Sequence, residues 1–394
     1  MVCGRGPALT AGTVERRTVP WQQYSTMSEP ALITSQSGRL TRGLPALVAA
    51  RGYEPVSTLV TDRPEDGQYY VSPGTIDRIE QRAADTGRGP LTLVVDGVPH
   101  PGQLADLRAR LQSVSVRDKR RVVWEHLAEK NPVAATCIEL QTARIARQQA
   151  VDSQRGAATR SPSGTSGRLA DIDSRIVDLR DALERRQRTA SQRVQTSYTG
   201  ADARVVLLGR GDAPTTVLWT ALTDGSTTPG TGRPARPVTS TATVGPHTLA
   251  VTDTPGVPGS DGIPHWLTRA VPGLSTALTQ ATCVLGVGEG EESLLRAVSE
   301  RFDVLCRSLD SVDAATARTV LADLLEATTY VVRLPYTDEA HALVSELHDR
   351  ATVTAIKYDE AVSLRVEVAR TATDELRRRV DALDGKLEVL DTNE

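Results

Sequence analysis

One stretch of the chain predicts its central fold: Val205-Val206-Leu207-Leu208-Gly209-Arg210-Gly211-Asp212-Ala213-Pro214-Thr215-Thr216. The apolar residues at its start predict a buried strand, the glycines predict a tight turn, and residues 215–222 predict a helix. A strand that enters a helix through a glycine-rich turn is the local arrangement in which backbone N–H groups bind phosphate. The stretch therefore predicts an α/β domain built around a phosphate-loop-like turn.

This turn departs from the full phosphate-binding sequence, which is Gly, four residues, Gly-Lys and then Ser or Thr. Gly209 opens the motif, but Pro214 and Thr215 replace the second glycine and the lysine. Proline has no backbone N–H to donate, and threonine has no charge to neutralise phosphate. A dinucleotide fingerprint is a weaker alternative, since its third glycine is also missing. The candidate phosphate-site residues are Gly209, Gly211, Asp212, Thr215 and Thr216.

A second motif follows at residues 248–256, where an apolar strand ends in Asp-Thr-Pro-Gly. In G proteins such a strand end places its Asp in the Mg²⁺ shell and its Gly N–H near the γ-phosphate. Asp253 and Gly256 are therefore candidate nucleotide-site residues, and Thr216 with Asp253 is the candidate Mg²⁺ pair. An ordinary turn is the alternative, because Pro-Gly is a common turn pair.

The flanking segments predict further units. Residues 30–130 alternate apolar strands, at 56–59 and 91–95, with helices at 76–84 and 103–111, which indicates a layered α/β domain. Residues 201–327 hold the two motifs, with a loop expected at 223–247. Residues 328–394 follow a β-α-β-β-α pattern, typical of a small ferredoxin-like α+β domain.

Residues 131–200 predict an antiparallel helical hairpin with a Gly/Ser/Thr-rich loop at 155–167. The second helix has a heptad-spaced apolar seam, which we expect to pack on the first helix. The seam is Leu169, Ile172, Ile176, Leu179 and Leu183, and its expected partners are Cys137, Ile138 and Ile145.

The hairpin is also basic. Between positions 144 and 193, eleven arginines face six acidic residues, a local charge of +5. A solvated helix surface explains this composition, and so does an arm that contacts RNA phosphate. The RNA-contact candidates are Arg185, Arg186 and Arg188.

The composition excludes several classes of protein. The 394 residues have a net charge of −3, which excludes a purely electrostatic nucleic-acid binder but permits local basic patches. No apolar run is long enough to span a membrane. The cysteines are scattered without a Cys-x-x-Cys pair, so we expect a reducing, cytoplasmic location. Residues 1–29 predict a disordered tail or a mis-assigned start.

Several further pieces share their order with one known family. They are Gln68-Tyr69-Tyr70-Val71-Ser72-Pro73-Gly74-Thr75, Pro101-Gly102-Gln103-Leu104-Ala105-Asp106-Leu107, Val116-Arg117-Asp118, Asp253-Thr254-Pro255-Gly256, Ile263-Pro264-His265-Trp266-Leu267 and Val332-Arg333-Leu334-Pro335-Tyr336. Together they resemble the HflX-type GTPases, which are Obg-related translation GTPases. The resemblance implies an α/β protein in three parts: an N-terminal α/β domain with a helical hairpin, an incomplete phosphate-loop G-like domain and a small C-terminal α+β domain.

The resemblance also exposes a missing guanine-reading element, Asn-Lys-x-Asp. Its nearest remnant is Cys306-Arg307-Ser308-Leu309-Asp310, in which Asp310 would bond guanine. We favour deletion of this loop, because too few residues separate Cys283 from Thr328 for two strand-helix units.

The resemblance therefore implies a degenerate HflX-like protein that binds the large ribosomal subunit or its RNA, with impaired or lost GTP hydrolysis. Its cofactor would be GTP or GDP with Mg²⁺, or none, and no DNA partner is expected. A working GTPase with an altered loop and a non-enzymatic interaction scaffold are the alternatives. Whether the chain is an enzyme stays open at this point.

Overall fold

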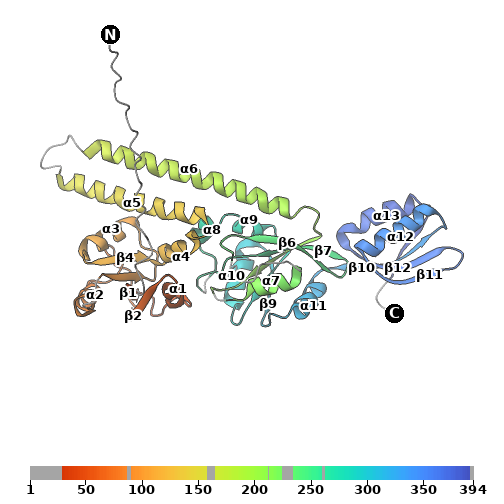
Figure 1. Ribbon diagram of the computed structural model, residues 1–394, viewed down its shortest axis with the longest axis horizontal. Coiled ribbons are helices and arrows are strands. Elements are labelled where there is room, and N and C mark those ends of the chain that lie inside the picture. Colours follow the sequence, from red (N-terminus) through yellow and green to blue (C-terminus); the bar gives the residue numbers. More distant parts are fainter. Residues whose placement is uncertain are drawn as a thin grey trace, which may run out of the picture.

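The computed structural model describes residues 29–86, 90–157, 165–211, 213–223, 234–259 and 262–390. Three sheets follow one another along an elongated molecule, and a long helical hairpin lies over the first two (Figure 1). The expectations for residues 1–28, and for the part of the hairpin loop at 158–164, lie outside the described residues. No described helix is long and apolar enough to cross a membrane.

The N-terminal sheet has four parallel strands in the order β2-β1-β3-β4. Strand β3 is a buried apolar run, as the sequence predicts for a parallel strand covered on both faces. The α/β prediction for this region is confirmed. The strands are β1 (Glu29–Ser35), β2 (Tyr53–Val60), β3 (Leu91–Val95) and β4 (Val114–Asp118), and the helices are α1 (Leu44–Ala50), α2 (Pro73–Thr86), α3 (Pro101–Arg110) and α4 (Lys119–Ala128).

The central sheet has five strands in the order β6-β7-β5-β8-β9, and only β6 is antiparallel to its neighbour. The strands are β5 (Ala203–Leu208), β6 (Val238–Val244), β7 (His247–Asp253), β8 (Cys283–Val287) and β9 (Leu305–Leu309). The helices are α7 (Thr215–Thr223), α8 (His265–Ala270), α9 (Leu274–Thr279), α10 (Glu292–Phe302) and α11 (Ala314–Leu324).

Two expectations about this sheet are wrong. Strand β6 lies in the segment expected to be a loop, because an edge strand needs only one apolar face, here Ala242 and Val244. The span after Cys283 holds two full strand-helix units, β8-α10 and β9-α11. Their connections are only a few residues long, so the argument for deletion of the guanine loop fails.

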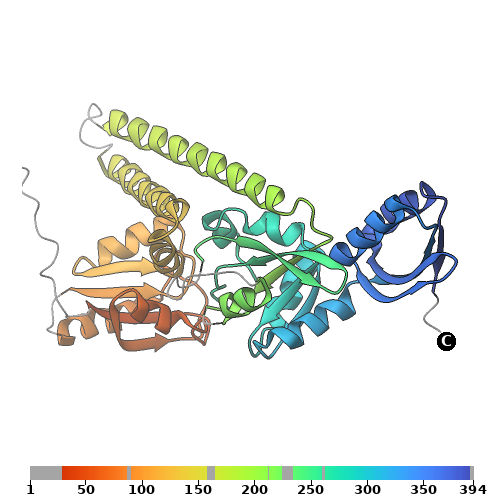
Figure 2. The ribbon, with the colours of Figure 1, turned by 45° about the vertical axis from the view of Figure 1, so that its right-hand side comes forward.

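The C-terminal sheet is antiparallel, in the order β11-β12-β10-β13, and lies at one end of the molecule (Figure 2). This β-α-β-β-α-β order is the ferredoxin-like arrangement, with a final strand that the sequence pattern did not reveal. The elements are β10 (Ala327–Leu334), α12 (Asp338–Arg350), β11 (Thr352–Tyr358), β12 (Val362–Ala369), the 3₁₀ turn η1 (Arg370–Ala372), α13 (Thr373–Asp381) and β13 (Lys386–Val389).

The hairpin pairs α5 (Pro132–Ala157) with α6 (Thr165–Ser197). Its seam is confirmed where Ile176, Leu179 and Leu183 are buried. Cys137 lies in the same core, but Ile145 packs into the core of the N-terminal sheet instead. The helix α5 therefore has two apolar faces, one for the sheet beneath it and one for α6.

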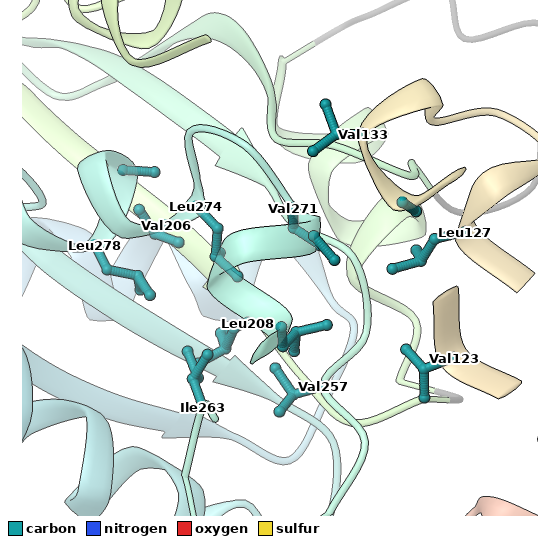
Figure 3. Close-up of a cluster of buried hydrophobic side chains, with 14 of the residues drawn as sticks. Val123, Leu127, Val133, Val206, Leu208, Val257, Ile263, Val271, Leu274 and Leu278 are labelled. Carbon is teal, nitrogen blue, oxygen red and sulfur yellow. The ribbon is translucent and has the colours of Figure 1, made fainter. Parts of the chain in front are cut away.

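One hydrophobic core joins the hairpin and α4 to the central sheet (Figure 3). Val123 and Leu127 of α4 and Val133 of α5 belong to the same cluster as Leu208 of β5 and Val271 after α8. A T-shaped pair of Trp124 and Trp266, with ring centroids 6.2 Å apart, also bridges the two parts.

Asn131 fixes the chain where it passes from the first part to the second. Its buried amide donates to Ala235 O and Ala270 O at 2.9 Å, while its Oδ1 accepts from Val133 N. Every polar atom of this side chain is therefore satisfied within the core, as burial requires.

We predict that Leu183→Ala lowers the free energy of unfolding by about 2–5 kcal/mol, because Leu183 is 1% exposed within this core. Val177→Ala is the control on the same helix, since Val177 is 53% exposed and its loss should cost less than about 0.5 kcal/mol. Urea unfolding of the full chain measures both. Equal effects would mean that the seam is not a core.

Candidate nucleotide site at the carboxyl edge of the central sheet

The carboxyl edge of the central sheet is where the predicted site residues meet. After β5 the chain continues to β6 and β7 on one side of the sheet, and after β8 it continues to β9 on the other. In open parallel sheets the ligand crevice lies at such a point, outside the carboxyl ends of the two strands. Gly209 follows β5, Asp253 ends β7 and Asp310 follows β9. The structure thus brings these predicted residues to one edge, while Asp212 lies outside the described residues.

The loop after β5 uses its backbone donors internally. Ala213 N donates to Arg210 O and Thr215 N donates to Ala213 O, both at 2.9 Å. The turn is also tightly closed, because a Cβ atom on Gly209 would lie 2.4 Å from Ala213 Cβ and 2.8 Å from Val287 O. Only glycine fits there. Pro214 has no N–H, so the loop offers few donors to an anion.

A buried ion pair occupies the crevice itself. Arg210 N–H donates to Glu291 Oε1 at 3.3 Å, and Arg210 Nε lies 3.4 Å from Glu291 Oε2. The guanidinium also donates to Gly290 O at 2.7 Å and to Ser293 Oγ at 3.1 Å. The Glu291 carboxylate therefore accepts a loop amide as a phosphate oxygen would. The sequence motif gave no sign of this partner.

The candidate Mg²⁺ residues are hydrogen-bonded to each other. Thr216 Oγ1 donates to Asp253 Oδ2 at 2.6 Å. Mg²⁺ needs about six oxygen ligands in octahedral geometry, and no group of three or more His, Cys, Asp or Glu able to hold a metal occurs in the part of the chain that the structure describes. Thr216 and Asp253 would thus hold Mg²⁺ only together with water and the oxygens of a bound phosphate.

Thr215, which replaces the motif's lysine, lies inside the loop. It is 1% exposed, and its Oγ1 has no hydrogen-bond partner within the described residues. Its Cγ2 lies 3.3 Å from the position of a Cβ atom on Gly209. The side chain therefore packs under the turn and presents nothing to a phosphate.

The sheet edge after β9, where the sequence predicts a guanine contact, also departs from the full motif. Asp310 is exposed after β9, whereas Asp313 caps α11 by accepting Thr316 N and Thr316 Oγ1 at 2.8 Å. These hydrogen bonds, the backbone one first, lower the pKa of Asp313. Asp310 stays a predicted guanine contact, without an Asn or Lys in the segment 306–310.

The N-terminal sheet approaches this edge across a cavity of about 410 Å³. Gly211 and Gly256 line its central side, and α1 and α4 line the other. Arg42 Nη1 reaches within 3.5 Å of the position of a Cβ atom on Gly290. The neighbouring residue Thr41 is held by Asp96. Its backbone N–H donates to Asp96 Oδ2 at 2.5 Å and its Oγ1 donates to Asp96 Oδ1 at 2.7 Å.

The predicted RNA-contact arginines have different roles. Arg186 donates to Pro132 O at 3.1 Å and to Thr136 Oγ1, so it joins the two hairpin helices. Arg185 lines a groove beside Arg186, and Arg188 lies outside that groove. Of these three arginines, Arg185 is the one that lines this groove without an ion pair or a side-chain hydrogen bond to a described residue.

No protein-family model and no curated protein matches the chain. Among solved structures it is similar to a GTP-binding protein from the hyperthermophilic archaeon Sulfolobus solfataricus in complex with GDP, at 15% identity and a TM-score of 0.36. A complex of SsGBP and GDP gives 15% identity and a TM-score of 0.37. Each comparison covers 76% of this chain and 98% of the other.

We predict that Glu291→Gln lowers the free energy of unfolding by about 3–5 kcal/mol, because it leaves the buried Arg210 charge without its partner. Glu326→Gln is the matched control, since the Arg370–Glu326 pair is 77% and 74% exposed and should cost less than about 1 kcal/mol. If both variants unfold alike in urea, the Arg210–Glu291 pair does not stabilise the crevice.

Proposed function

We propose that the chain is an HflX-like, ribosome-associated protein whose central domain keeps the form of a G domain but has lost GTP hydrolysis. The observation that carries this proposal is the Glu291 carboxylate at the loop amide of Arg210. A bound phosphate would have to displace this carboxylate and would meet its negative charge.

The missing contacts are large enough to matter. A charge-assisted contact to phosphate is worth about 1.5–3 kcal/mol, or roughly 10- to 150-fold in affinity. The loop lacks the lysine, lacks the amide at Pro214 and uses the Ala213 and Thr215 amides internally. Hydrolysis should suffer more than binding, because the lysine stabilises charge that develops in the transition state.

A working GTPase is the second candidate. The retained Thr216–Asp253 pair favours it, since these two oxygens lie together where a Mg²⁺ ion would meet a bound nucleotide. Gly209 and Gly256 are also retained. The two candidate functions differ in the behaviour of the Arg210–Glu291 ion pair. A working GTPase requires that a bound nucleotide break this pair, whereas the first proposal requires that the pair stay in place.

The ribosomal part of the proposal has separate support. The N-terminal pieces and the hairpin resemble those of the HflX-type family, and the hairpin carries a net charge of +5 between positions 144 and 193. A positive arm binds RNA phosphate with an affinity that falls as salt rises.

We predict that fluorescent GDP and GTP, titrated with and without Mg²⁺, bind more weakly than about 10 µM, with no steady-state hydrolysis. The double variant Pro214→Gly with Thr215→Lys should bind more tightly, because it restores an amide and a charge. Micromolar or tighter GTP affinity with steady turnover in the natural chain would establish the second candidate instead.

We also predict that the chain co-sediments with large ribosomal subunits at about 50 mM salt and is released by about 200 mM. Replacing Arg185 and Arg188 with Glu should weaken association. The control replaces Arg296 and Arg377, which are exposed and lie outside the hairpin. If co-sedimentation changes neither with salt nor with the arginine substitutions in the hairpin, the RNA-binding role is wrong.

A further inference from the structure

A groove at the root of the hairpin is lined by basic side chains from three separate segments. Its volume is about 530 Å³. Its basic lining residues are Lys130 before α5, Arg185, Arg186 and Arg193 on α6, and Arg236 before β6. Among the described residues that line it, none is acidic. We propose that this groove binds the phosphodiester backbone of folded RNA, a proposal that rests on the ribosome-associated function above.

The charges in this groove are uncompensated. Lys130, Arg185, Arg193 and Arg236 are exposed, and within the described residues none of them forms an ion pair or a side-chain hydrogen bond. Some arginines elsewhere on the hairpin are paired, as in Arg147–Asp173 and Arg175–Glu139. The groove is therefore a local concentration of free positive charge in a chain with a net charge of −3.

Arg186 has a different part in the groove. Its guanidinium donates to Pro132 O and Thr136 Oγ1 and so fixes α6 against the start of α5. Asn131, whose amide bridges to the central part, lies in the same wall. The groove is thus preformed by bonds that do not involve its free charges.

The spacing of these charges suits a row of phosphates. Arg185, Thr189 and Arg193 lie on one face of α6, four residues apart. The two arginines are separated by about 12 Å along the helix axis, at about 1.5 Å per residue. One phosphate group cannot contact both ends of such a row, whereas the backbone of a nucleic acid carries a charge every few ångströms.

The lining also indicates which part of the RNA is bound. No aromatic side chain is among the described residues that line the groove. Single-stranded nucleic acids are usually held by bases stacked on aromatic rings, so this groove offers no surface for unpaired bases. Contacts to phosphate alone fix position without reading sequence, as in shape-dependent binding of RNA helices.

The test measures the anisotropy of a fluorescent RNA duplex of about 20 base pairs with the full chain between about 50 and 200 mM KCl. The groove variant combines Arg185→Gln, Arg193→Gln and Arg236→Gln. The control combines Arg78→Gln, Arg296→Gln and Arg377→Gln, which are exposed and form no ion pair within the described residues. Both variants change the net charge equally.

The groove variant should bind at least about tenfold more weakly, and the slope of log K against log salt should fall by about three. The control should change by less than about twofold. Because the substituted groove side chains form no ion pair or hydrogen bond with the described residues, urea unfolding of both variants should match that of the natural chain. Equal losses in the two variants would overturn the proposal, as would complete displacement of the duplex by equimolar inorganic tripolyphosphate.

Co-sedimentation with large subunits separates the two proposals. If the natural chain pellets with subunits and the groove variant pellets equally, the groove proposal is wrong and the ribosomal function stands. If the natural chain does not pellet but still binds the duplex through the groove, the ribosomal function is wrong and the groove remains an RNA site.

Discussion

The central parallel sheet must be covered on both faces, and the rest of the molecule is arranged to meet that requirement. Alternate side chains of β5 point to opposite sides, with Val205 and Leu207 in one core and Val206 and Leu208 in the other. Helices α7 and α11 cover the first face. The second is covered by α8, α9 and α10 together with α4 and the hairpin, so the N-terminal part cannot separate without exposing the core.

Helices cover both faces of the sheet but not its carboxyl edge. At that edge the Glu291 carboxylate lies against the loop after β5. Glu291 accepts the loop amide of Arg210 and lies in an ion pair with the Arg210 guanidinium, and Thr216 donates directly to Asp253. The basic groove lies elsewhere, where the hairpin root meets β6. The same contact between hairpin and sheet therefore completes the core and brings together the free positive charges.

The sequence predicted those elements whose signal is local. Apolar runs identified β3, β5 and β7, and heptad spacing identified the seam of α6. Strand β6 was not predicted, because its threonine-rich sequence is also typical of a loop. Its two buried apolar residues, Ala242 and Val244, are recognised only once the strand is paired with β7. The Arg210–Glu291 pair joins residues 81 positions apart, and the groove joins three segments. Such sites depend on the tertiary fold, although the eight-residue spacing of Arg185 and Arg193 is visible in the sequence.

The Glu291 carboxylate also bears on how the stability of the fold depends on ligands in solution. A protein whose folded form binds a ligand gains stability in proportion to the logarithm of that ligand's concentration. Glu291 is part of the chain, so its effective concentration at the loop amide of Arg210 never varies. The stability that this contact contributes is consequently the same at every concentration of a soluble anion.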